Sequence, residues 1–186
     1  METSQRLKSI LFEDASIGTY AILDGASIPD LLDQLEADRP EYLCLYRGEL
    51  KEGLEVVAPY LVRLEPHHTF TRWLLAFGWG RHFGVFLHAD VSLAALRLHL
   101  RRGLRVYTED RDALYFRYYD PRVLRVFLPT TTPEEAGAFF GLIGTFLCES
   151  EDPTKCLHFA VRNGALRQQV RSLEGESDWE GIETGR

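Results

Sequence analysis

Apolar and polar residues recur with two periods along this chain, and the changes between them predict its elements. Short runs that alternate, or that are apolar throughout, predict strands at 19–23, 42–46, 60–64, 82–88, 104–107, 114–119, 146–148 and 157–161. Apolar residues spaced by three or four positions predict helices after Ser27, across 69–77, after Asp90 or Ser92, and from Pro121 and Pro133. Alternating strands and helices predict an α/β fold, with α+β as the alternative. We expect a mixed central sheet flanked by helices, either in one domain or in two small lobes that share a core.

The first of these elements have the order of a βαβ unit. The strand at 19–23, the helix after Ser27 and the strand at 42–46 occupy about the length that such a unit needs. Asp24-Gly25 and Arg39-Pro40 supply the turn and helix-stop signals between them.

The sharpest change of period lies between Leu114 and Leu128. A strand pattern rich in aromatic residues stops at Asp120-Pro121, and a helical pattern starts there. Asp is a favoured N-cap and Pro a favoured first helical residue, so Asp120 and Pro121 are predicted to form a structural cap. The switch brings arginines and aromatic rings close together.

This cluster is the candidate partner-binding site. Tyr and Arg are enriched among the residues that contribute most to protein interfaces, although the same side chains also fill cores and form internal ion pairs. Both interpretations stay open from the residues alone. The candidate residues are Tyr115, Arg117, Tyr118, Tyr119, Arg122 and Arg125.

Composition limits the function classes. The net charge is −7, whereas a nucleic-acid-binding protein normally shows a basic balance or stripe. The nearest approach to a stripe is formed by Arg97, Arg101, Arg102 and Arg105, which we interpret as a solvated or acid-paired helix face. No apolar run approaches the roughly 18 to 20 residues that span a bilayer, and no secretory signal is apparent. Three cysteines without a close pair indicate free thiols, so a cytoplasmic location is expected.

Catalytic, cofactor and metal signatures are missing from the sequence. It contains no glycine-rich phosphate loop, no G-x-S-x-G motif and no close His or Cys pair with metal-ligand spacing, so we expect no enzyme activity, cofactor or metal. Asp24 and Asp120, with a histidine, leave one alternative open, a small cytosolic hydrolase or transferase.

Several motifs occur in an order that resembles the type VI secretion effector chaperone (adaptor) family, long catalogued as a domain of unknown function. The matching motifs are YAILDG at 20–25, APYLVRL at 58–64, Trp79-Gly80, GVFL at 84–87, LAALRLHLRRGL at 93–104, FRYYDPRVL at 116–124, Leu128-Pro129 and Phe139-Phe140-Gly141. The resemblance covers about residues 18–148. It implies a non-enzymatic cytosolic adaptor-chaperone that binds a cognate secreted effector, keeps it soluble and delivers it to the VgrG spike protein. An immunity protein that blocks a basic toxin is a further alternative.

The resemblance and the patterns together predict four segments. Residues 1–17 form an N-terminal extension, and 18–148 the chaperone/adaptor domain. Residues 149–173 are expected to form a hairpin and helix that complete the fold. Residues 174–186, rich in acids and glycine, are expected to be a disordered tail.

Overall fold

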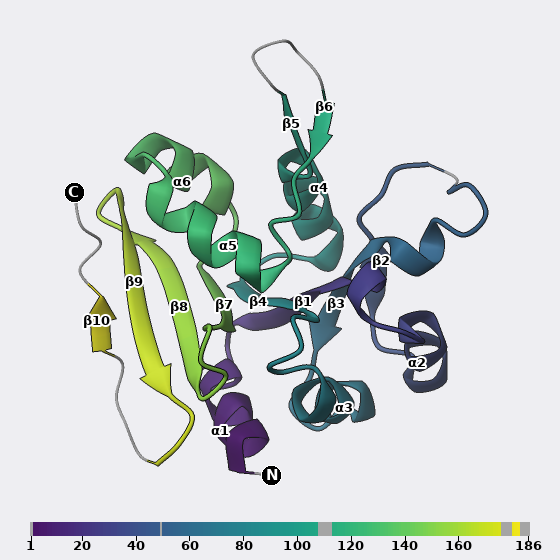
Figure 1. The fold of residues 1–186 in the computed structure, drawn as a ribbon, viewed down its shortest axis with the longest axis horizontal. Coiled ribbons are helices and arrows are strands. Elements are labelled where there is room, and N and C mark those ends of the chain that lie inside the picture. The colour runs from purple at the N-terminus through teal and green to yellow at the C-terminus, as the bar shows by residue number, and fades with distance from the viewer. Residues whose placement is uncertain (1, 49, 108–112, 176–179, 183–186) are drawn as a thin grey trace.

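The computed structural model describes residues 2–48, 50–107, 113–175 and 180–182 (Figure 1). Its helices are α1 (Glu2–Leu11), α2 (Leu31–Asp38), α3 (Thr69–Phe77), α4 (Leu93–Gly103), α5 (Pro121–Phe127) and α6 (Pro133–Phe140). Its strands are β1 (Gly18–Asp24), β2 (Tyr42–Cys44), β3 (Pro59–Leu64), β4 (Gly84–Ala89), β5 (Arg105–Tyr107), β6 (Ala113–Tyr115), β7 (Thr145–Glu149), β8 (Lys155–Arg162), β9 (Ala165–Ser172) and β10 (Glu180–Ile182). The mixed fold of helices and strands is confirmed.

Eight of the strands form one central sheet in the order β10-β9-β8-β7-β4-β1-β3-β2. All of its described pairs are antiparallel. β1 and β2 run in the same direction, as a βαβ unit requires, but β3 lies between them and pairs with both. The expected unit is therefore split by an inserted antiparallel strand.

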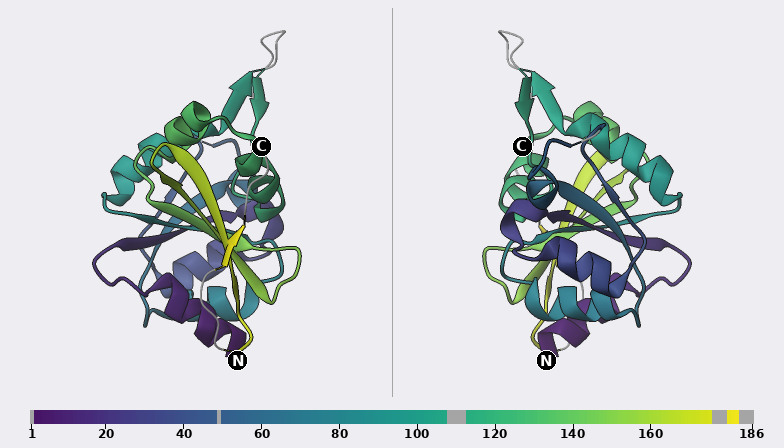
Figure 2. Two further views of the ribbon diagram at one scale, coloured as in Figure 1. Left: turned by 90° about the vertical axis from the view of Figure 1, so that its left-hand side faces the viewer. Right: turned by 90° about the vertical axis from the view of Figure 1, so that its right-hand side faces the viewer.

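Helices cover both faces of this sheet, α1, α2 and α3 on one and α4, α5 and α6 on the other (Figures 1 and 2). The central strands are apolar on both faces because each face needs a core. In β1, Tyr20 and Ile22 join the cluster under α4–α6, whereas Ala21 and Leu23 join the cluster under α1–α3. The two clusters are the two sides of one sheet, so the described chain forms one layered core and not two lobes.

Gly84 fits the close approach between two of these central strands. A β-carbon at this position would lie 2.0 Å from the backbone oxygen of Ile22 on β1. A backbone atom of a central strand cannot move aside, so only glycine is accommodated there.

The chain ends differ from what the sequence predicts. Residues 2–11 form α1, whose Leu7, Ile10 and Leu11 are buried in the core, so most of the expected extension is part of the fold. Where a helix is expected after residue 164, the chain forms β9, and Asn163 and Gly164 make the tight turn that joins it to β8 with positive φ angles of 53° and 76°.

The acidic C-terminal segment also contributes to the sheet. Within the expected tail, residues 180–182 form β10, which pairs with β9. Residues 176–179 and 183–186 of that predicted tail lie outside the described residues.

Candidate partner-binding site

Asp120 and Pro121 start α5 as the sequence predicts. The Asp120 carboxylate accepts a hydrogen bond from the Arg122 backbone N–H at 2.9 Å, and Pro121 takes the first turn. The Arg122 guanidinium also donates to both carboxylate oxygens, at 2.7 to 3.2 Å. Burial alone would raise the pKa of Asp120, but these hydrogen bonds outweigh it and lower the pKa. The cap is therefore held as a carboxylate.

Arg117 pairs with a carboxylate that is distant in the sequence, that of Asp24 on β1. Its guanidinium donates to Asp24, which is completely buried at the end of β1. The Asp24 carboxylate also accepts from the Ala26 backbone N–H at 3.1 Å and from the Ser27 hydroxyl at 2.8 Å. Although partial burial tends to lower the pKa of Arg117, its hydrogen bond and charge interaction with Asp24 raise it. This ion pair links the motif at 116–124 to the motif at 20–25, and its two residues are 93 positions apart in the sequence.

The two neighbouring tyrosines are internal. Tyr118 is 1% exposed, and its hydroxyl donates to the Leu100 carbonyl at 2.8 Å, which ties it to α4. Tyr119 is 4% exposed. Burial raises the pKa of both phenols. Because they are covered, these two side chains act as packing for the cluster and not as its outer surface.

The remaining candidates lie at the surface to different extents. Tyr115 is 62% exposed, and its ring lies 5.7 Å from that of Tyr46. Arg122 has half of its side chain exposed, whereas Arg125 is mostly covered and lies 3.7 Å from Glu151. The predicted cluster therefore divides into two buried tyrosines, three arginines that are ion-paired at different depths, and one exposed aromatic, Tyr115.

Tyr115 stands on a hairpin that projects from the body of the protein. β5 and β6 pair in a two-stranded sheet of their own, separate from the central sheet, and extend beyond the end of α4 (Figures 1 and 2). The sequence predicts this hairpin but extends its second strand to Tyr119, whereas the strand ends at Tyr115. The chain turns there because Tyr118 and Tyr119 are drawn into the core.

A hollow lies on each side of the base of this hairpin. The first, with a volume of about 700 Å³, separates the hairpin from the loop that follows β2. We call it the cationic groove, and it is lined by Leu45, Tyr46, Arg47, Leu50, Lys51, Leu54, Arg101, Arg102, Leu104, Arg105 and Tyr115. The second, of about 670 Å³, lies between α4 and the helices α5 and α6. We call it the aromatic hollow, and its lining includes Phe116, Tyr118, Phe127, Phe139 and Ala138.

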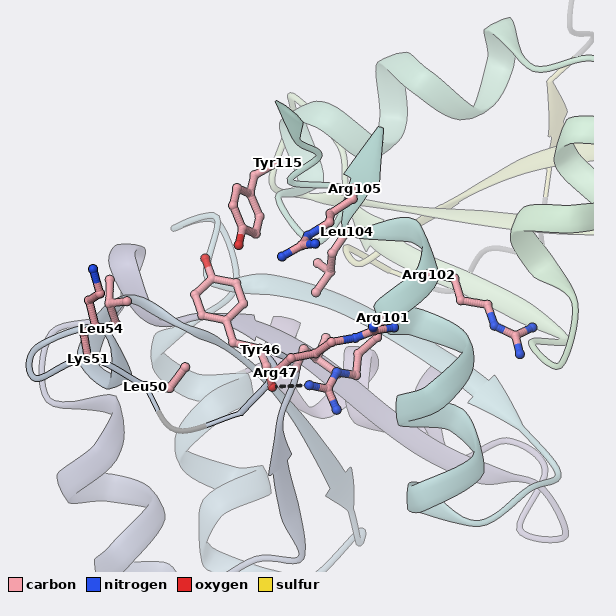
Figure 3. Close-up of a pocket in the computed structure, with 11 residues that line it drawn as sticks. Tyr46, Arg47, Leu50, Lys51, Leu54, Arg101, Arg102, Leu104, Arg105 and Tyr115 are labelled. Carbon is pink, nitrogen blue, oxygen red and sulfur yellow. Dashed lines mark hydrogen bonds between the residues drawn. The ribbon is translucent and has the colours of Figure 1, made fainter. Parts of the chain in front are cut away.

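Figure 3 shows how the side chains of the cationic groove are placed. Tyr46 and Tyr115 face one another across it, and Arg105 extends beside them, with its guanidinium 5.9 Å from the Tyr115 ring centre. Arg101 donates to the Tyr46 carbonyl at 2.7 Å, which fixes the loop against α4. Arg102 points away from this group toward the other side of α4. Hence the groove has a fixed wall and several exposed cations.

The residues that the sequence suggests as catalytic alternatives form hydrogen bonds within the fold. Asp24 and Asp120 are each held by an arginine and a backbone N–H. Among the histidines, His88 contacts the Thr145 hydroxyl and the Leu11 carbonyl, and His99 contacts the Phe139 carbonyl. In the described ranges, no group of three His, Cys, Asp or Glu side chains could hold a metal ion.

Two parts of this surface are hard to find by sequence reasoning. Arg47 and Lys51 lie in a segment whose sequence indicates only a polar connection. The apolar residues that line the aromatic hollow have the spacing of an ordinary helix core. The concentration of arginine near the end of α4 is the one signal that points to the groove.

The fold and these hollows together define a mixed α/β domain with a candidate partner-binding surface around a projecting hairpin. The family model of DUF4123, described as a domain of unknown function, matches residues 19–138, and the chain belongs to this family. Comparison with curated proteins and with solved structures found no match. In the parts of the chain that are described, none of the helices has the length and apolar character to cross a bilayer.

Proposed function

We propose that this protein is a cytosolic, non-enzymatic adaptor-chaperone of type VI secretion. It binds a cognate secreted effector, keeps it soluble and delivers it to the VgrG spike protein. The motif order described above resembles that chaperone family, and membership of DUF4123 is compatible with this role. The observation that carries the proposal is the pair of hollows, of about 700 and 670 Å³, on either side of the projecting hairpin.

The aromatic hollow gives the proposal its physical basis. Rings of Phe116, Phe127 and Phe139 lie 4.7 to 5.3 Å apart and present an apolar wall that is open to the surface. Val126 on α5 and Leu142, which follows α6, are further apolar side chains that are exposed. Such a surface can cover apolar residues of another chain that would otherwise aggregate, and binding alone then stabilises the soluble form without ATP.

The enzyme alternative is less well supported. Its two proposed carboxylates are bound to Arg117 and Arg122 and act as a strut and a helix cap. A general acid or base must reach a substrate proton, and a carboxylate that is buried and fully hydrogen-bonded is poorly placed to do so.

The test is made in the native bacterium. Deletion of the gene is expected to lower the soluble amount of an effector encoded next to it severalfold, and the effector should co-purify with the chaperone and with VgrG. Tyr115→Ala, at an exposed position between the two hollows, should reduce co-purification, whereas Phe77→Ala on α3 serves as the matched exposed-aromatic control. An unchanged level of every neighbouring effector on deletion would overturn the proposal.

A further inference from the structure

The cationic groove collects positively charged side chains that have no carboxylate partner among the described residues. Arg47, Lys51 and Arg105 are exposed, and Arg101 is half-buried beside them. Among the described residues, none of these four side chains has a carboxylate within 4 Å, although other arginines of the fold, such as Arg117 and Arg171, do. Within the described part of the chain, Arg47, Lys51 and Arg105 therefore have charges free for a ligand, and Arg101 lies beside them while donating to the Tyr46 carbonyl.

This concentration of charge is unfavourable in the free protein. Partial burial and then the positive charges of Arg97 and Arg47 lower the pKa of Arg101. Like charges repel more strongly where the surrounding side chains exclude water. A negatively charged ligand would relieve this local repulsion, although the net charge of the whole sequence is −7.

The walls between the cations favour a polypeptide over a nucleic acid. Leu50 and Leu54 line the groove at its surface together with the two facing tyrosine rings, and the buried Leu45 and Leu104 lie behind them. Apolar side chains of a peptide can pack on such a surface, whereas a polynucleotide presents a continuous row of phosphates without apolar side chains between them.

We infer that the cationic groove binds an acidic segment of the partner polypeptide, with Asp or Glu carboxylates on Arg47, Lys51, Arg101 and Arg105 and intervening apolar side chains against Leu50 and Leu54. This inference rests on the proposed function, because the segment belongs to the cargo. It adds the chemistry by which the cargo is recognised: carboxylate pairing at the groove, beside apolar burial in the aromatic hollow.

A binding assay with synthetic peptides tests the charge requirement without any effector. A fluorescein-labelled peptide of repeated Glu-Leu-Glu-Ser units is titrated with the full chain and compared with its Gln-Leu-Gln-Ser counterpart by fluorescence anisotropy. We expect the Glu peptide to bind at least about tenfold more tightly and its affinity to fall with added salt. Arg47→Glu and Lys51→Glu should each weaken its binding by about fivefold, whereas Arg72→Glu, at an exposed position on α3, should not.

Three results would overturn the inference: equal binding of the two peptides, tighter binding of a labelled oligothymidylate than of the Glu peptide, or a dimer in sedimentation that Arg47→Glu dissolves. The first two remove the acidic peptide as the preferred ligand, and the third makes a second copy of the chain the occupant. If the peptides fail to discriminate but Tyr115→Ala still reduces effector capture, the charge inference fails and the proposed function stands. If the Glu peptide binds as expected but no effector depends on the gene, the groove remains a carboxylate-binding site and the proposed function fails.

Discussion

Replacement of Arg117 by alanine leaves the Asp24 carboxylate buried without its cation. Asp24 is completely covered, whereas the Arg117 side chain is 45% exposed. Exposed ion pairs contribute about 0.2 to 1 kcal/mol, and loss of one partner from a fully buried pair costs about 3 to 5 kcal/mol. Because one partner is buried and Asp24 keeps its two local hydrogen bonds, we expect Arg117→Ala to lower the free energy of unfolding by about 2 kcal/mol.

A double-mutant cycle separates this ion pair from other effects of the substitution. Asp24→Asn removes the charge that Arg117 neutralises, so in that background Arg117→Ala should cost less than about 1 kcal/mol. Arg63→Ala is the control, because Arg63 pairs at 3.5 Å with Glu41 and both side chains are more than half exposed. Its cost should stay within about 0.5 kcal/mol.

Urea denaturation followed by tryptophan fluorescence provides the measurement, with equal m-values required for the comparison. The reasoning is refuted if Arg117→Ala costs no more than Arg63→Ala, or if Asp24→Asn leaves the cost unchanged. If Arg117→Ala destabilises the protein as expected, a loss of effector capture by this variant has to be corrected for the unfolded fraction before it can be assigned to the surface.

Three further predictions concern the fold. Gly84→Ala should destabilise the protein by about 3 kcal/mol, because its new methyl group meets the Ile22 backbone. Gly137→Ala, with open space around it in α6, should instead stabilise the protein by about 0.5 to 1 kcal/mol. Thermal melts of the two variants should therefore shift in opposite directions. Thr132→Ala removes the capping box of α6 and should cost about 1 kcal/mol by urea titration; no measurable change would mean that the cap is dispensable. Burial lowers the pKa of His158 from 6.5 to about 4, so its contribution to stability is complete above pH 6.5 and is lost as the pH falls toward 4. By linkage, the stability lost between neutral pH and about pH 5 because of His158 is about 2 kcal/mol. His158→Gln should remove that part of the acid sensitivity, and an unchanged pH profile would contradict the assignment.

Local signals predicted much of this fold. The cap at Asp120-Pro121, the start of α6 at Pro133 and the apolar stripe of α4 each depend on residues within one or two turns. The strand at 165–172 was missed because Ala, Leu, Arg and Gln favour helices. In the protein, pairing with β8 through the turn at Asn163-Gly164 overrides that preference.

The candidate site was predictable only in part, because its organisation depends on contacts between distant segments. The sequence marks Arg117 and Tyr118 as unusual, but nothing near them reveals that one reaches Asp24 and the other the carbonyl of Leu100. The cationic groove likewise forms where the loop after β2 meets the end of α4, and the arginines of α4 do not by themselves reveal which loop completes it.

The arginines of α4 have a consequence for the free edge of the sheet. β2 lies at that edge, and its Cys44 carbonyl and the following Tyr46 carbonyl accept hydrogen bonds from Arg97 and Arg101, both at 2.7 Å. The unpaired backbone groups of a free edge strand would let an aggregation-prone polypeptide pair as another strand, whatever its sequence. With these two acceptors occupied, strand addition at this edge is disfavoured, and binding of a polypeptide there has to depend on side chains, which differ from one polypeptide to the next.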